Sequence, residues 1–136
     1  MNISQAAAAS GVSAKMIRHY EAIGLVPKPR RTGANYRTYS EADVHMLRFV
    51  RAARDLGFSM AEIGELLDLW RDRRRPSRKV KALATAHVRE LERRIAELQA
   101  MKTTLEQLAH HCHGDERPEC PILERLEGGG PATWRK

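Results

Sequence analysis

The feature that most constrains this chain is an apolar repeat in its C-terminal half. Apolar residues recur every seven positions, and a second, shorter row lies between them. The first row is Ala84, Leu91, Leu98 and Leu105, and the second is Val88 and Ile95. This spacing is typical of a coiled-coil seam, although Lys102 interrupts the second row. A helix of roughly 33 residues is about 50 Å long and cannot bury such a stripe against a small domain. We therefore expect a second copy of the chain to cover it, in preference to packing within one chain.

The residues before this stripe have the pattern of a helix-turn-helix. Gly11 supplies the corner between two short helices, and Ser13 is the expected N-cap of the second, over residues 14–22. Lys15, Arg18 and His19 share one face of that helix by their spacing. A basic face on the second helix of such a motif predicts contact with DNA.

A hairpin and two more helices complete the expected head. The string PKPRRTGANYRTY, residues 27–39, combines turn residues with alternating aromatic and basic residues, which predicts a small wing. Ser40 and Ser59 each resemble the N-cap of a helix. Pro76 then interrupts the helical pattern, and we expect the long helix to begin near Ser77.

Charge and composition favour a polyanionic partner. The formal net charge is +7, and the six Lys or Arg residues between Ser13 and Ser40 face a single acidic residue, Glu21. A basic surface that only keeps the protein in solution is the alternative. The N-terminus has no signal-peptide pattern, and no apolar run reaches the roughly 18 residues of a membrane span, so we expect a cytoplasmic protein without a membrane partner.

The two cysteines, Cys112 and Cys120, lie in one short segment. In a reducing compartment such a pair indicates a metal or redox site. Thiolate sulfur is a soft ligand that favours Cu(I), with Ag(I) or Au(I) as alternatives, whereas structural zinc normally takes four ligands. His110, His111 and His113 can complete a divalent site, so a sensor of Zn(II) or another divalent ion remains open.

Three strings carry a resemblance to a known family. GVSAKMIRHYEAIGLV, NYRTYSEADVHMLRFVRAARDLGFSMAEI and the heptad helix closely resemble the MerR family over roughly residues 1–127. The string CHGDERPECPIL resembles its copper-responsive branch, the CueR or HmrR type. The resemblance implies a mainly α fold, with a winged helix-turn-helix head and a long helix that forms an antiparallel coiled coil in a homodimer. It also implies a regulator that activates transcription by RNA polymerase through distortion of double-stranded promoter DNA.

These expectations define four segments. Residues 1–75 form the winged DNA-binding head, 76–109 the dimerisation helix, 110–127 the metal-binding loop with a short helix, and 128–136 a disordered tail.

The expected DNA contacts divide into base and backbone contacts. Arg18 suits guanine through two parallel hydrogen bonds, and Lys15 suits a base or a phosphate. The expected backbone contacts are Arg31, Tyr36, Arg37 and Arg54. Tyr36 packed beneath the wing is an equal alternative.

Two residues at the start of the long helix complete the metal assignment. The resemblance implies serine there in copper sensors and cysteine in divalent sensors, and this chain has Ser77. Lys81, one turn further on, is a candidate for offsetting the negative charge of a bis-thiolate Cu(I) centre, and a solvated lysine is an equal alternative. An enzyme is not expected, because the chain has no nucleotide-binding loop or nucleophile with a base, and a dithiol redox protein is the remaining rival from another class.

Overall fold

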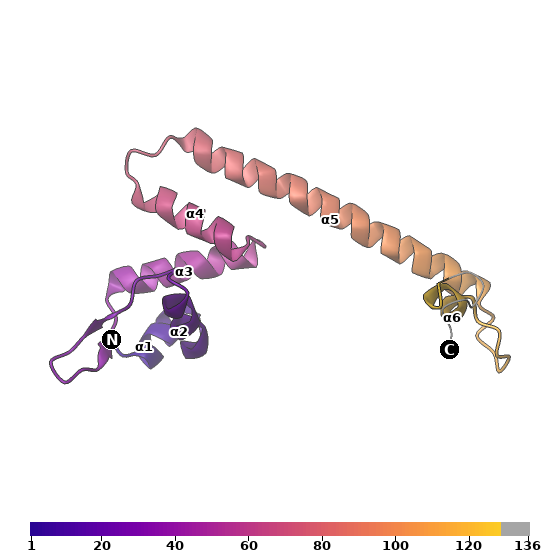
Figure 1. Cartoon of the computed structure of the whole chain (residues 1–136), viewed down its shortest axis with the longest axis horizontal. Helices are drawn as coiled ribbons and strands as arrows, with labels where there is room; N and C mark the ends of the chain where they lie inside the picture. The colour runs from indigo at the N-terminus through magenta and orange to yellow at the C-terminus, as the bar shows by residue number, and fades with distance from the viewer. Residues whose placement is uncertain (129–136) are drawn as a thin grey trace. The chain divides into compact units, whose positions relative to one another are not determined.

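The computed structural model describes residues 1–128, and the expected disordered tail therefore lies almost entirely outside the described residues. The chain is mainly helical (Figure 1), as expected. The elements are α1 (Ile3–Ser10), α2 (Ala14–Ala22), β1 (Arg30–Arg31), β2 (Arg37–Thr38), α3 (Glu41–Asp55), α4 (Met60–Arg71), α5 (Ser77–His111) and α6 (Pro121–Leu126). They form two compact units, residues 1–85 and the residues from 86 onward, with α5 running through the boundary. The four-segment division above, whose first boundary falls at residue 75, stays a prediction.

The first unit is built around one apolar core. Helices α1, α2, α3 and α4 contribute to it, and its largest fully buried side chains are Tyr20, Ile17, Ile63, Leu67 and Val50. Burying an aliphatic or aromatic side chain of this size stabilises a fold by about 1.5 to 3 kcal/mol. The core therefore fixes the orientation of α2, which contributes two of these residues.

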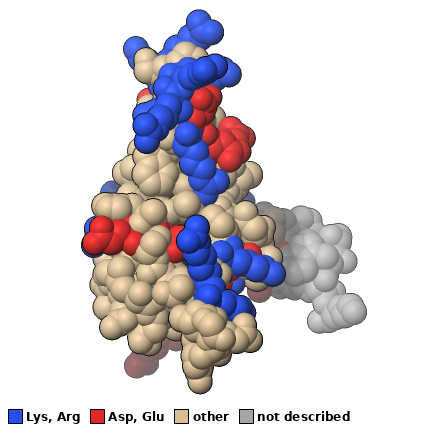
Figure 2. Space-filling model, turned by 90° about the vertical axis from the view of Figure 1, so that its left-hand side faces the viewer, with Lys and Arg blue, Asp and Glu red and all other residues tan. Residues whose placement is uncertain are grey.

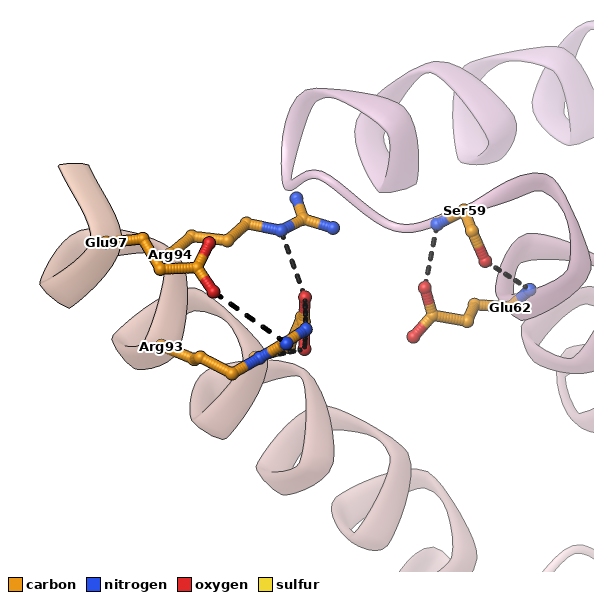
Figure 3. A network of polar contacts seen from close by, with 6 residues as sticks. Ser59, Glu62, Arg93, Arg94 and Glu97 are labelled. Carbon is orange, nitrogen blue, oxygen red and sulfur yellow. Dashed lines mark hydrogen bonds and ion pairs between the residues drawn. The ribbon is translucent and has the colours of Figure 1, made fainter. Parts of the chain in front are cut away.

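Short polar side chains begin the helices of the head, as the sequence predicts. Ser13 accepts a hydrogen bond from the backbone N–H of Met16 at the start of α2. Ser40 and Ser59 each form a reciprocal capping box, with Asp43 and Glu62 respectively. The pair Ser59 and Glu62 is drawn in Figure 3. Such caps satisfy backbone N–H groups that have no partner within the helix.

The predicted hairpin is present as a short wing. Strands β1 and β2 are antiparallel, with Arg30 opposite Thr38 and Arg31 opposite Arg37. Asn35 turns the chain between them with a φ of 66°. The backbone of Tyr39 then bonds to Met1 in both directions, which ties the end of the wing to the N-terminus.

Helix α5 contains 35 residues and carries the apolar stripe. It continues through His110 and His111, two residues past the expected boundary, because nothing at these positions breaks a helix and imidazoles near a C-terminus suit the helix dipole. Val88, Ile95, Leu98 and Leu105 are each more than half exposed in the single chain. No helix among the described residues is long and apolar enough to cross a membrane.

Candidate DNA-reading surface and thiol site

Helix α2 presents its basic residues outward. Lys15, Arg18 and His19 are all exposed, whereas Ile17 and Tyr20 on the opposite side are buried in the core. The helix is thus held by its apolar side, and its basic side is free to enter a groove of DNA.

A buried carboxylate joins α2 to the wing. Glu21 is 5% exposed and accepts hydrogen bonds from Tyr39 Oη at 2.6 Å and from Arg37 Nη1 at 2.8 Å. Burial, followed by the hydrogen bond to Glu21, raises the pKa of the Tyr39 hydroxyl above its ordinary value. The sequence identifies Glu21 only as the one acidic residue of a basic segment and does not predict its buried link to Arg37 and Tyr39. An acidic residue at the end of a helix that precedes a wing was the available signal.

The other expected backbone contacts are placed differently. Arg54 Nη1 donates to Tyr20 Oη at 2.7 Å, and Arg31 Nη1 donates to the carbonyl of Asn35 at 3.1 Å. Tyr36 is 73% exposed, so it does not pack beneath the wing. Because a guanidinium has five N–H donors, the observed bonds leave Arg31, Arg37 and Arg54 further donors for phosphate. In the view toward the side of the molecule that carries the wing, basic side chains predominate over acidic ones (Figure 2).

The two cysteines form a free thiol pair in the second unit. Cys112 follows the last residue of α5, Cys120 precedes the first residue of α6, and their Sγ atoms are 3.9 Å apart. Both are half-buried and neither forms a disulfide. The loop between them turns at Gly114, with a φ of 66°. The sequence separation of eight residues therefore becomes a contact between the two sulfur atoms.

The start of α6 favours the thiolate form of Cys120. Hydrogen bonds from the backbone N–H groups of Leu123 and Ile122 lower the pKa of the Cys120 thiol, Leu123 having the larger effect. Pro121 at the first helical position has no N–H to donate. Thiolate is the form of cysteine that binds metal ions.

The histidines do not join the thiol pair. His110 and His111 lie in the last turn of α5 with their rings 5.5 Å apart, and His113 is exposed on the loop. No group of three or more His, Cys, Asp or Glu side chains suited to a metal ion occurs between residues 1 and 128. Ser77 and Lys81 lie in the first two turns of α5, at the other end of the helix from the cysteines.

The face of α5 that carries the apolar stripe contrasts with a charged network on the same helix. Glu90 binds Arg93 and Arg94, and Arg93 also approaches Glu97 at 3.8 Å (Figure 3). The hydrogen bond from Arg93 lowers the pKa of Glu90 below its usual range. Exposed pairs of this kind contribute little stability. None of these four charged residues belongs to the apolar stripe.

These features define a winged helix-turn-helix DNA-binding protein with a thiol pair at the far end of its long helix. The family model of the MerR HTH family regulatory proteins matches residues 1–70, and a second model, described as MerR, DNA binding, matches residues 44–108.

Individual relatives agree with the family models. The HTH-type transcriptional regulator HmrR of Sinorhizobium medicae is 60% identical over 133 residues, covering 98% of this chain and 90% of that protein. The HTH-type transcriptional regulator CueR of Salmonella typhimurium is 44% identical over 128 residues, covering 94% and 93%. The crystal structure of the transcription regulator PbrR691 from Ralstonia metallidurans in complex with lead(II) aligns with a TM-score of 0.81 at 31% identity, covering 93% of this chain and 98% of that one. The chain therefore belongs to the MerR family, and HmrR and CueR are transcriptional regulators and not enzymes.

Proposed function

We propose that this chain is a metal-responsive transcriptional regulator that binds promoter DNA as a homodimer and activates transcription when Cu(I) binds Cys112 and Cys120. The similarity to HmrR and CueR supports the regulatory role, and the lead(II) complex of PbrR691 supports a metal effector. The observation that carries the copper assignment is the thiol pair, with Sγ atoms 3.9 Å apart.

The donor set fits a soft monovalent ion. With metal–sulfur bonds of about 2.3 Å, as in zinc sites, one ion can bridge sulfur atoms up to about 4.6 Å apart. The separation of Cys112 and Cys120 lies within that reach. Two thiolates with no third side-chain ligand grouped with them among residues 1–128 suit Cu(I), and also Ag(I) or Au(I), better than an ion that needs four ligands.

The charge of the site is compatible with the same ion. Two thiolates and one monovalent cation leave one net negative charge, which the N–H groups of Ile122 and Leu123 stabilise at Cys120. We assign Ser77 and Lys81 of the second copy to the surroundings of this centre. The basis is the resemblance to regulators in which the start of the long helix reaches the partner's loop.

The DNA-binding half of the proposal uses the exposed side of α2 and the wing. Arg18 reads a base edge in the major groove, flanked by Lys15 and His19. Arg31, Tyr36, Arg37 and Arg54 hold the phosphate backbone. Metal binding changes the promoter DNA seen by RNA polymerase only if the ion binds one conformation of the dimer more tightly than another.

A divalent-ion sensor of the same family is the second candidate. The similarity to the lead(II)-bound PbrR691 favours it, as do the three histidines next to Cys112. The two candidates differ in ligand number and type, which a single measurement distinguishes.

That measurement is an anaerobic titration with Cu(I) or Zn(II), followed by X-ray absorption at the metal edge. We expect one Cu(I) per chain with two sulfur ligands and no nitrogen ligand. A variant with His110, His111 and His113 all changed to Gln is expected to give the same spectrum, and Cys112→Ser is expected to lose the ion. Nitrogen ligation that disappears in the histidine variant, or a transcriptional response to Zn(II) equal to that to Cu(I), would contradict the copper assignment.

A further inference from the structure

The connection between α4 and α5 carries an unusual concentration of positive charge. Its basic side chains are Arg71, Arg73, Arg74, Arg75, Arg78 and Lys79, which we call the basic junction. All six are exposed, and Asp72 is the single acidic residue among them, so residues 71–79 carry a net charge of +5. Figure 2 shows the density of basic side chains on this side of the molecule.

Much of this charge is not neutralised within the chain. Arg75 donates to the carbonyl oxygens of Trp70 and Asp72, at 3.3 and 3.1 Å, and Arg71 lies 4.0 Å from Asp68. In the part of the chain that the structure describes, the guanidinium groups of Arg73, Arg74 and Arg78 form no hydrogen bond or ion pair. Like charges so close together repel one another, which favours an acidic partner.

The loop of the thiol pair has the opposite charge. Residues 113–119 contain Asp115, Glu116 and Glu119 against one basic residue, Arg117. Asp115 is already bound to Arg117 at 2.8 Å. Glu116 and Glu119 are exposed and have no hydrogen-bond or ion-pair partner among the described residues. Two carboxylates are thus available next to the thiols.

The apolar stripe determines what lies opposite this loop in a dimer. Ala84 and Leu105, the ends of the stripe, are equally far from the point between Arg94 and Ile95. Two stripes that pair antiparallel about that point place Ala84 of one copy opposite Leu105 of the other. Ser77 precedes Ala84 by seven residues, and Cys112 follows Leu105 by seven residues. The thiol loop of one copy therefore begins opposite Ser77 of the other, to within about one helical turn.

Charge also favours the antiparallel direction. Helix α5 has three basic residues, Arg78, Lys79 and Lys81, near its start and no acidic residue in its first turn. A parallel pair would place two basic junctions side by side, whereas an antiparallel pair places each junction near an acidic loop.

We propose that the basic junction of one copy binds Glu116 and Glu119 in the thiol loop of the second copy, forming an electrostatic clamp between subunits at each metal site. The clamp rests on the proposed homodimer, and it adds a charged contact between the subunits beside each pair of cysteines. Arg73 and Arg74 of one copy hold the loop that carries Cys112 and Cys120 of the other. Guanidinium groups suit this role because they donate parallel hydrogen bonds to a carboxylate.

The test is the rate of subunit exchange between dimers labelled at the N-terminus, measured without metal. We expect Glu116→Lys with Glu119→Lys to accelerate exchange about tenfold or more, since each dimer contains two copies of the clamp. Arg73→Glu with Arg74→Glu is expected to have a similar effect. A chain with all four reversals restores opposite charges and should exchange at nearly the wild-type rate. These differences should shrink as salt rises from about 0.05 to about 0.5 M.

The control reverses two exposed carboxylates of α3, Glu41→Lys with Asp55→Lys, and should leave exchange nearly unchanged. The clamp is overturned if the four-residue reversal exchanges as fast as either pair alone, or if neither pair alters exchange. It is also overturned if reversal of the arginines only weakens operator binding, which would identify a DNA contact. A wild-type chain that sediments as a monomer would overturn the dimer itself. If the clamp variants exchange subunits at the wild-type rate and still bind Cu(I), the clamp is wrong and the proposed function stands.

Discussion

Arg18 and Arg37 are both basic residues of the head, yet their surroundings give them different roles. Arg18 points from the exposed side of α2, while Arg37 is bound to the buried carboxylate of Glu21. A side chain without a protein partner is free to read a base, whereas a side chain held at one end is better suited to a fixed backbone contact.

Arg18→Ala should therefore weaken binding to the promoter more than binding to random DNA. Loss of a bidentate base contact costs about 1 to 3 kcal/mol of discrimination. Fluorescence anisotropy with operator and scrambled duplexes measures both affinities. Arg31→Ala, in the wing, is the comparison. It should weaken binding to both duplexes by the same factor and make the binding affinity less dependent on salt. Equal losses for Arg18→Ala on the two duplexes would remove it from the base-reading role.

Tyr39 predicts a dependence of stability on alkaline pH. Because its pKa is raised in the folded chain, the neutral hydroxyl stabilises the fold below the ordinary value of 10.0, and this stability is lost as the pH rises through the folded pKa. Tyr39→Phe should cost about 1 to 3 kcal/mol at neutral pH, since it removes a hydrogen bond to a buried charge. The difference in unfolding free energy between the wild type and Tyr39→Phe, measured by urea denaturation, should become smaller above pH 10. Tyr36→Phe, at an exposed position, should have no such effect, and a deficit independent of pH would contradict the assignment.

Substituting either thiol should separate sensing from DNA binding. Cys112→Ser or Cys120→Ser leaves a single thiolate, which is insufficient for a two-sulfur site. We expect loss of Cu(I)-dependent transcription in a reporter assay, with operator affinity within about twofold of the wild type, because α2 is in the other compact unit. A variant that keeps the response would show that the paired thiols are not the sensor.

At the scale of the element, the corner between α1 and α2 depends on glycine mainly through its left-handed backbone conformation. Gly11 has a φ of +76°, and a Cβ built there would lie 1.7 Å from Nη1 of Arg51. Gly24, after α2, has a φ of +77° but open space around it, and Gly33 in the wing has open space. Gly11 and Gly24 therefore test the cost of a left-handed backbone, and Gly33 is the comparison in open space.

Alanine substitutions at these glycines should rank accordingly. Gly33→Ala should change the free energy of unfolding by less than about 0.5 kcal/mol. Gly24→Ala should cost about 1 to 2 kcal/mol through the left-handed backbone alone. Gly11→Ala should cost about as much as Gly24→Ala, because the atom nearest the added Cβ is the end of the flexible, exposed Arg51 side chain and can move away. Urea denaturation in which Gly11→Ala costs much more than Gly24→Ala, and in which Arg51→Ala removes the excess, would contradict this.

At the scale of the whole molecule, the exposed stripe of α5 should decide assembly. Leu91→Glu with Leu98→Glu would bury unpaired charge in the seam and should yield monomers by sedimentation. Loss of the dimer should also weaken operator binding, because each half-site of the operator is bound by the DNA-binding head of one subunit. Ala96→Glu with Thr103→Glu, outside the seam, should leave the dimer intact. A dimer that survives the leucine changes would require a different interface.

Local sequence by itself determined most of the elements. Ser13, Ser40 and Ser59 start α2, α3 and α4 because their side chains replace missing helical partners of nearby N–H groups, and Pro121 starts α6 because its fixed φ suits a first turn. The heptad of α5 is also a local pattern. These effects act over a few residues, so they can be recognised without a fold.

Only the tertiary structure decided which distant side chains meet. Glu21 joins Arg37 and Tyr39 across 16 and 18 residues, and Arg54 reaches Tyr20 across 34, because the packing of α2, α3 and the wing brings them together. Cys112 and Cys120 were recognisable as a pair, but their 3.9 Å contact and the N–H groups that favour the Cys120 thiolate depend on how α5, the turn at Gly114 and α6 follow one another. Such contacts depend on burial and chain direction in three dimensions, which residue spacing does not specify.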